Sequence, residues 1–394
     1  MSKKKIIFIA ENAGAGGVIY VINNLINGLR DFFDFEVILI NYQWRNVPDA
    51  SQLFQKQGIN TYIIEITHKQ NKYKALKRMA EIMKTADLIV ASYIYELAAY
   101  SIEKLTVPLI LMIHGDYEPE QKMLQLLKDT DIVDLFVPIS QKIYQTVKEI
   151  TGQNNVVYLR HAIPDHTPNK YIEQFSESFT ITFIGRFNKP KGSDLLLQIG
   201  KKLYDRDKNI SYIIITDGIG EKDFKTQWQP LNDTVFYSKI SNEQVQNLLL
   251  QSHIILMPSR SEGLPLSLVE AMRKGVVPVV SDLRTGMREL VEDGKNGFLC
   301  PVGDIDCFVE KILFLKKNRD ILSKFSNEAI KKVKQLFDYQ TNLMKYKEVF
   351  EKTMLKRREK KYYLPYPKIL GKLDKPYIPD FLFRLIKFIK NSLS

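Results

Sequence analysis

The sequence has few cysteines and no long apolar run, and both absences narrow the class of protein. Only two of the 394 residues are cysteine, Cys300 and Cys307. Two cysteines cannot build a disulfide framework, so we expect two ordinary, partly buried thiols. No apolar run approaches the roughly 18 residues that a membrane-spanning helix needs. The chain also lacks low-complexity segments and internal repeats of fixed period.

The N-terminus is basic, but the apolar run that follows is too short for a secretion signal. Lys3, Lys4 and Lys5 precede a run that ends at Ala10, and Glu11 comes next. We therefore predict a first strand at this position and a cytoplasmic protein. A hydrophobic content of 45% is ordinary for a globular protein, and the length allows roughly two to three domains.

Positive charge is concentrated at the C-terminal end. Residues 355–394 contain eleven Lys or Arg and three Asp or Glu, a net charge of +8 out of +12 for the whole chain. The remaining residues carry only +4. Most of the net positive charge of the protein therefore lies in its C-terminal tail.

Short apolar runs rich in Ile, Val and Phe alternate with longer helical patterns. Continuous rather than alternating apolar strands indicate burial on both faces, hence parallel sheets covered by helices. We predict an α/β protein of two Rossmann-like, doubly wound domains that face each other across a cleft. The predicted strands are 6–10, 37–42, 62–66, 88–91, 109–113, 135–139, 156–159, 179–184, 212–216, 235–237, 254–257, 277–280 and 298–300.

A polar stretch at 164–175 marks the predicted break between the two domains. We predict a first domain over 1–166 and a second over 167–338. A helix that crosses back is expected over 339–354, and a basic amphipathic tail over 355–394.

The segment 259–275 predicts a loop and a helix after a buried strand. Pro265 suits the first helical position, where a missing N–H costs nothing, and Gly275 suits the C-terminal cap. The amides around Gly263 and Leu264 would then point outward at the positive end of the helix. Such a helix start binds an anion.

Two carboxylates flank this anion site. Glu270, on the helix, can accept both hydroxyls of a ribose, and Glu262, in the loop, can accept hydroxyls of a sugar beside the reacting group. The alternative is that both are solvated surface charges. A nucleotide sugar has the matching order of hydroxyls, diphosphate and ribose.

A second loop supplies two cations. The predicted strand 179–184 ends at Gly185, and Arg186 and Lys191 follow before a helix that begins near Ser193. Fixed cations at the carboxyl end of a strand can neutralise a departing diphosphate in place of a metal ion. The alternative is again two solvated side chains. Short Asp-x-Asp matches at 205–207 and 304–306 occur often by chance, so we predict no metal site.

These motifs resemble the retaining glycosyltransferases of family 4, among the glycosyl transferases group 1, which have the GT-B fold. The resemblance is strongest over 179–304. It implies a nucleotide-sugar donor, retained anomeric configuration and no required metal. The residues that carry it are Gly185-Arg186, Lys191-Gly192, Asp217-Gly218, and Glu262 followed eight positions on by Glu270.

The resemblance also implies a role for each matching residue. Arg186 and Lys191 would bind the diphosphate, Glu262 would face the donor sugar, and Glu270 would hold the ribose. The donor site would further include Asp217 and the backbone of Gly263, Leu264 and Leu266.

Two features of the first domain are compared with the same family. Gly16 and Gly17 do not complete a dinucleotide fingerprint, because Ile19 stands at the third glycine position. They resemble the family's Gly-Gly loop near donor phosphate and acceptor, or they form a plain strand–helix turn. His114 follows a strong predicted strand, where the family has a histidine. It either contacts the donor sugar or is structural.

Some details depart from the family pattern. The loop 281–289 lacks the usual paired glycine and is one residue longer, and His161-Ala162 replaces the usual Asn-Gly. These differences put the local loop geometry in doubt rather than the donor site.

The tail begins with Lys356-Arg357-Arg358 and continues to an aromatic, basic stretch at 381–390. A basic amphipathic helix with aromatics is typical of an interfacial membrane element, which anionic lipid attracts. The alternative is that it packs on the body. Nucleic acid is disfavoured because the aromatics sit among aliphatics. The basic stretch 68–78 could line the same face.

We therefore predict a cytoplasmic, metal-independent, retaining hexosyltransferase, peripheral on the inner face of the cell membrane. Its donor would be a UDP-sugar in preference to a GDP-sugar, and its acceptor a lipid-linked or cell-surface glycan. Glu262, His114, Arg186 and Lys191 would serve the chemistry, with front-face attack because no strong nucleophile is evident. The alternatives are a sugar-nucleotide epimerase, a phosphorylase, or a non-catalytic sugar-nucleotide binder.

Overall fold

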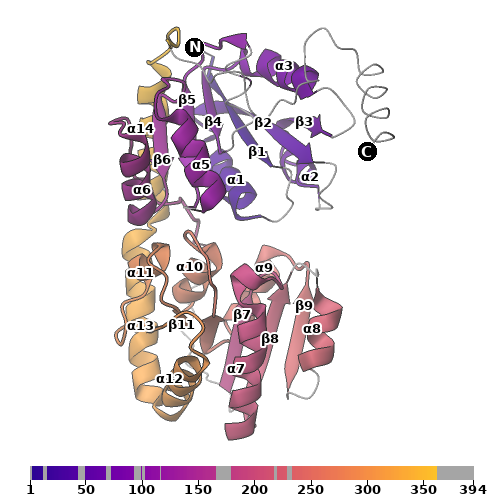
Figure 1. Ribbon diagram of the computed structural model, residues 1–394, viewed down its shortest axis with the longest axis vertical. Coiled ribbons are helices and arrows are strands. Elements are labelled where there is room, and N and C mark those ends of the chain that lie inside the picture. The colour runs from indigo at the N-terminus through magenta and orange to yellow at the C-terminus, as the bar shows by residue number, and fades with distance from the viewer. Residues whose placement is uncertain are drawn as a thin grey trace, which may run out of the picture. The chain divides into compact units, whose positions relative to one another are not determined.

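The computed structural model describes residues 2–11, 16–42, 49–67, 72–92, 99, 103–115, 117–165, 179–216, 220–228 and 233–361. The chain forms two compact units. Unit 1 comprises Met1–Ile139, Ile143–Pro164 and Tyr339–Ser394, and unit 2 comprises Ser140–Lys142 and Asp165–Asp338. Each unit contains a six-stranded sheet whose strands are all parallel (Figure 1).

The sheet of unit 1 has the strand order β3-β2-β1-β4-β5-β6. Strands β4, β5 and β6 are apolar throughout and buried, as expected for a sheet with helices on both faces. The strands are β1 (Lys4–Glu11), β2 (Phe33–Tyr42), β3 (Asn60–Ile66), β4 (Leu88–Ala91), β5 (Leu109–Ile113) and β6 (Leu135–Pro138). The helices are α1 (Gly17–Leu29), α2 (Ser51–Gln55), α3 (Lys72–Met83), α5 (Glu118–Leu127), α6 (Gln141–Thr151) and α14 (Tyr339–Met354).

Helix α14 belongs to unit 1 although it follows the whole of unit 2 in the sequence (Figure 1). The ring of Phe350, on α14, lies 6.1 Å from Phe8 on β1 and 6.2 Å from Phe33 on β2. Tyr346 stacks edge-on against Phe350, and both side chains are buried. Burial of each such ring contributes about 1.5–3 kcal/mol, so α14 completes the core of this unit.

Basic residues just after α14 tie the chain to unit 1. Lys356 donates to the carbonyl of Asp134, and Arg357 donates to the carbonyl of Ala86. Arg358 pairs with Asp131 at 2.5 Å, and Lys360 pairs with Asp134. These cations at the start of the predicted tail are thus bound to the protein itself. The remainder of the tail, 362–394, lies outside the described residues.

The Lys360–Asp134 pair is fully enclosed, with side-chain exposures of 0% and 1%. Asp134 also accepts the amide of Leu109, the first residue of β5. Burial lowers the pKa of the Lys360 ammonium, and the attraction of Asp134 opposes that shift. The pair fastens the end of the described chain to the start of β5 and β6.

The sheet of unit 2 has the order β12-β11-β10-β7-β8-β9, which repeats the order of unit 1. Its strands are β7 (Phe179–Ile184), β8 (Ile210–Thr216), β9 (Thr234–Ser238), β10 (Ile254–Met257), β11 (Val277–Ser281) and β12 (Phe298–Cys300). A 3₁₀ turn, η1 (Lys189–Lys191), follows β7. The helices are α7 (Ser193–Arg206), α8 (Glu221–Trp228), α9 (Asn242–Leu249), α10 (Leu266–Arg273), α11 (Gly286–Leu290), α12 (Ile305–Lys317) and α13 (Arg319–Leu336).

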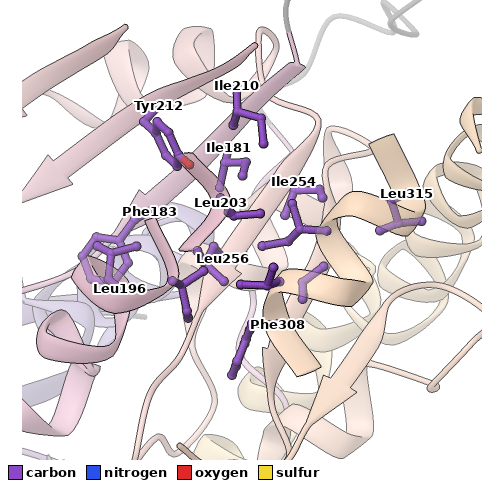
Figure 2. Close-up of a cluster of buried hydrophobic side chains, with 14 of the residues drawn as sticks. Ile181, Phe183, Leu196, Leu203, Ile210, Tyr212, Ile254, Leu256, Phe308 and Leu315 are labelled. Carbon is purple, nitrogen blue, oxygen red and sulfur yellow. The ribbon is translucent and has the colours of Figure 1, made fainter. Parts of the chain in front are cut away.

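The main core of unit 2 lies between one face of this sheet and helices α7, α8, α12 and α13. Figure 2 shows residues that β7, β8, β10, α7 and α12 contribute to this core. Alternate residues of each strand point into it, among them Ile181 on β7, Tyr212 on β8 and Ile254 on β10. Ile213 and Ile215 point to the opposite face, where they pack near Leu248 of α9. Both faces are therefore apolar, which explains the continuous apolar strands in the sequence.

The predicted α/β class with two doubly wound parallel sheets is confirmed, but the predicted strand at 156–159 is wrong. Val156 forms only an isolated bridge with Phe136 on β6. The amides of Val157 and Leu159 donate to carbonyls of β6. To continue the ladder, the amide of residue 138 on β6 would have to donate back, but this residue is Pro138. Proline has no N–H, so the ladder stops there.

The expectation of two free thiols is also wrong, because Cys300 and Cys307 form a disulfide. Cys300 ends β12 and Cys307 lies in the first turn of α12. Gly303, with φ of 85°, reverses the chain between them and brings their Cα atoms to 5.7 Å. That separation is within the range that a disulfide requires.

The enclosed ion pair gives a test of how the tail segment stabilises unit 1. Lys360→Ala removes the ammonium that donates to the buried Asp134 carboxylate and leaves only Arg358, 3.7 Å away, which should cost about 3–5 kcal/mol. The exposed neighbour Lys361→Ala is the matched control and should change little. The midpoint of urea unfolding measures both variants. Equal midpoints for the two would contradict the role of this pair.

Candidate functional site

Strands β7 and β10 are neighbours at the centre of the unit 2 sheet. The chain leaves β7 toward β8 on one side and leaves β10 toward β11 on the other. Loops that diverge in this way at the carboxyl ends of parallel strands form the usual ligand site of a doubly wound sheet. Here the two loops are 185–192 and 258–265.

The two loops are bonded to each other. The amides of Arg260 and Ser261 donate to the carbonyl of Pro190 at 2.7 and 3.3 Å. Gly192 has φ of 69°, and a Cβ at this position would lie 2.0 Å from the carbonyl oxygen of Pro258. Only glycine accommodates both the left-handed backbone and this close approach. The loops therefore meet backbone to backbone.

This approach brings Lys191 and Glu262 into a bidentate ion pair. The Lys191 ammonium lies 2.7 Å from each carboxylate oxygen of Glu262, and the Ser259 hydroxyl donates to Oε1 at 2.8 Å. Glu262 is only 4% exposed, whereas the Lys191 side chain is 30% exposed. The carboxylate is thus enclosed and compensated, while its cation still reaches solvent.

The loop after β7 carries a further cation. Arg186 is exposed directly after Gly185, at the end of β7. The backbone of Lys191 is fixed because its amide donates to the Asn188 side chain at 3.0 Å. Asp217, which the sequence also assigned to this site, lies outside the described residues.

Glu270 lies in the second turn of α10, which follows the loop of Glu262, and is 8% exposed. The Asn242 amide donates to its Oε1 at 3.0 Å. Asn242 is the first residue of α9, which a capping box formed by Ser241 and Gln244 holds in place. One carboxylate oxygen of Glu270 is thereby oriented by a side chain from a neighbouring helix.

Helix α10 begins without a side-chain cap. Its N-cap is Pro265, one residue earlier than the helical position predicted for it, and the helix starts at Leu266. Gly263 is braced because its carbonyl accepts the amide of Gly286 at 2.9 Å. Loop 281–289 is the loop that differs from the family pattern. A Cβ at Gly286 would lie 2.6 Å from Leu264 Cδ1, so the lack of a side chain at Gly286 lets this loop pack against the start of α10. The predicted C-terminal glycine, Gly275, has φ of 80° as expected.

In unit 1, the strands that correspond to β7 and β10 are β1 and β4. Gly16 is the N-cap of α1, which starts at Gly17 without a side-chain cap. Ser92 follows β4, and His114 follows β5. The Ser92 hydroxyl and His114 Nε2 are joined by a hydrogen bond of 3.1 Å.

A second histidine stacks on His114. The rings of His114 and His161 lie 5.7 Å apart and 23° from parallel, and His161 is buried. Removal from water lowers the pKa of His114 from 6.5 to about 4, and it lowers the pKa of His161 as well, where nearby His114 adds to the shift. Both imidazoles are therefore neutral near pH 7, and His114 serves as a hydrogen-bonding group rather than a cation.

The Asp-x-Asp segments have structural partners. Asp207 pairs with Lys316 at 2.5 Å, and Asp306 pairs with Lys202 at 2.5 Å. Asp304 caps α12 by accepting the amide of Cys307. Within the described part of the chain, no group of three or more His, Cys, Asp or Glu residues could hold a metal ion.

The structure brings Lys191 to Glu262 and places Glu270 on the helix that Gly263, Leu264 and Leu266 lead into. His114, Gly16 and Gly17 lie in unit 1. Sequence reasoning missed the hydrogen bonds of Ser259, Asn242 and Ser92 to site residues. Ser259 stands three positions before Glu262, which is a usable signal. Asn242 is separated from Glu270 by 28 positions, so no sequence pattern indicates their contact.

Residues 168–332 match the family model described as glycosyl transferases group 1. The chain is 27% identical to an uncharacterized glycosyltransferase of Haemophilus influenzae, over 83% of this chain and 94% of that protein. It is 24% identical to poly(ribitol-phosphate) alpha-N-acetylglucosaminyltransferase of Staphylococcus aureus, over 50% of this chain and 39% of that protein. Among solved structures, Anabaena Alr3699/HepE in complex with UDP and glucose gives a TM-score of 0.74 at 18% identity, covering 89% of this chain and all of that one.

The state of His114 can be measured directly. We expect its imidazole to remain neutral through the range in which an ordinary histidine titrates, because its pKa is lowered to about 4. The unfolded chain takes up this proton first as pH falls, so the group's contribution should reduce stability between pH 6.5 and about 4. NMR titration of the histidine signals, assigned with His114→Gln, tests this. A midpoint near 6.5 would contradict it.

Proposed function

We propose that this chain, whose residues 168–332 form a glycosyl transferases group 1 domain, is a retaining glycosyltransferase. It would move a hexose from a nucleotide sugar, a UDP-sugar in preference to a GDP-sugar, to a glycan. The observation that carries this proposal is the Lys191–Glu262 pair at the point where the loops of β7 and β10 diverge, beside the uncapped start of α10.

Arg186 and Lys191 would bind the diphosphate of the donor. Phosphate oxygens are strong partners for fixed cations, and negative charge builds on the diphosphate as it departs. The start of α10 supports the same anion, because its first amides lack partners within the helix and carry the positive end of the helix dipole. These groups would supply the stabilisation that other transferases obtain from a metal ion.

Glu262 and Glu270 would bind the two ends of the donor, its sugar and its ribose. A carboxylate accepts hydrogen bonds from paired hydroxyls, which suits Glu270 for the ribose. Asn242 engages one of its oxygens and orients the group. Glu262 would accept hydroxyls of the donor sugar. A bound diphosphate would attract the Lys191 ammonium away from Glu262, and this would free the Glu262 carboxylate for those hydroxyls.

The bonding of Glu262 supports front-face attack by the acceptor rather than a double displacement. When Lys191 turns to the diphosphate, one oxygen of Glu262 still accepts from Ser259, and hydroxyls of the donor sugar would occupy the carboxylate, which lowers the electron density available for attack on a sugar carbon. The acceptor hydroxyl would then attack from the side that the diphosphate leaves, with the departing group accepting its proton.

Unit 1 would supply the acceptor side. Neutral His114, held by Ser92, would offer a hydrogen bond to the donor sugar without adding charge at the reacting centre. Gly16 and Gly17, at the start of α1, would allow close approach of the donor phosphate or the acceptor.

The donor and acceptor classes are supported by the similar proteins. The Anabaena structure holds UDP and glucose, and the S. aureus relative is named for transfer of N-acetylglucosamine to poly(ribitol-phosphate). We therefore favour a lipid-linked or cell-surface glycan as acceptor. No helix among the described residues is long and apolar enough to cross a membrane. We propose a cytoplasmic enzyme that binds the inner face of the membrane through residues 362–394.

The donor site is tested by two substitutions. Lys191→Ala should lower kcat about 10²–10³-fold, because it removes a cation that stabilises the leaving diphosphate. Glu270→Ala should mainly raise the Kd for UDP, about 10-fold, through loss of a charge-assisted hydrogen bond. Calorimetry with UDP and release of UDP from a panel of UDP-sugars measure these effects.

Lys201→Ala, on the exposed side of α7, is the matched control and should behave as wild type. Wild-type activity in both site variants would sink the assignment. Conversion of the donor without acceptor would instead indicate an epimerase, consumption of inorganic phosphate a phosphorylase, and binding without turnover a sugar-nucleotide binder.

The membrane role is tested by truncation after Lys361, which keeps the ion pairs that fasten residues 356–360 to unit 1. The shortened protein should lose binding to vesicles with anionic lipid, since four of the five remaining tail cations, Lys356, Arg357, Arg358 and Lys360, are bound to protein groups. Vesicles of neutral lipid are the control in a sedimentation assay. Equal binding by full-length and truncated protein would overturn the proposal.

A further inference from the structure

An arginine fork joins the two donor-side loops outside the site itself. Arg260, in the loop after β10, donates from Nη1 and Nη2 to the two carboxylate oxygens of Asp194, at 2.6 and 2.7 Å. Asp194 is the second residue of α7, so its charge also suits the positive end of that helix. The hydrogen bonds from Arg260 hold the pKa of Asp194 below its usual value.

The same arginine grips the backbone that carries Lys191. Its Nη1 also donates to the carbonyl of Lys189 at 3.0 Å, and its amide donates to the carbonyl of Pro190 at 2.7 Å. These two carbonyls immediately precede Lys191, and Arg260 itself stands two positions before Glu262. One residue thus fixes the chain on both sides of the Lys191–Glu262 pair.

We infer that Arg260 is a positioning residue: with Asp194 it sets the separation of Lys191 and Glu262 for transfer, an inference that rests on the proposed function. The pair is partly exposed, with side-chain exposures of 29% and 48%, so its contribution to stability is small. Its effect lies in geometry, since a displacement of about 1 Å in a reacting group can lower a rate 10²-fold.

The matched variants are Arg260→Gln and Arg206→Gln. Arg206 lies in the last turn of helix α7, where it pairs with Glu310 in a more exposed salt bridge. Arg260→Gln should lower kcat about 10–100-fold while its melting temperature stays within about 4 °C of wild type. Arg206→Gln should keep wild-type kcat. The exchanged pair Arg260→Asp/Asp194→Arg should recover part of the loss.

Hydrogen exchange separates this inference from the proposed function, because it needs no substrate. The amides of Arg260 and Ser261, which donate to Pro190, should exchange faster in Arg260→Gln and at the wild-type rate in Arg206→Gln. Wild-type protection of both amides in Arg260→Gln overturns the inference even if UDP-sugar turnover is found. If both amides lose protection in Arg260→Gln but the wild-type protein turns over no nucleotide sugar, the positioning role of Arg260 is supported and the proposed function is contradicted.

Discussion

A carboxylate that has left water must be compensated inside the protein, and at Glu262 this requirement governs the donor-side loops. An uncompensated charge there would cost several kcal/mol. Lys191 and Ser259 supply the compensation. Lys191 reaches Glu262 only because Gly192 lets the two loops touch backbone to backbone, and because β7 and β10 are adjacent in the sheet. Strand order, loop conformation and charge pairing therefore depend on one another.

Much of the fold could be predicted because it depends on local composition. Each strand of both sheets contains an apolar run, because strands covered by helices on both faces must bury most of their side chains. The edge strands β3 and β9 also carry polar, exposed residues. The one false strand, 156–159, has the right composition but the wrong partner, because Pro138 on β6 cannot donate. The Cys300–Cys307 disulfide likewise depends on a chain reversal at Gly303 rather than on cysteine number.

The candidate site was predictable in its residue types but not in its bonding. Glu262, Glu270 and Lys191 stand in recognisable segments, yet no local pattern reports that Lys191 occupies both oxygens of Glu262. The fork between Arg260 and Asp194 spans 66 positions and forms only when two loops converge. Such contacts are products of topology. The two sheets illustrate the same point, because they share one strand order without a repeat in sequence.

The return of α14 to unit 1 has a consequence for biosynthesis. A ribosome synthesises all of unit 2, Ser140–Lys142 and Asp165–Asp338, before it makes Phe350 or Lys360. Until then β1 and β2 lack the ring that covers them, and Asp134 lacks its cation. The half of the molecule that is translated first is thus the half whose core is completed last, when α14 has been made.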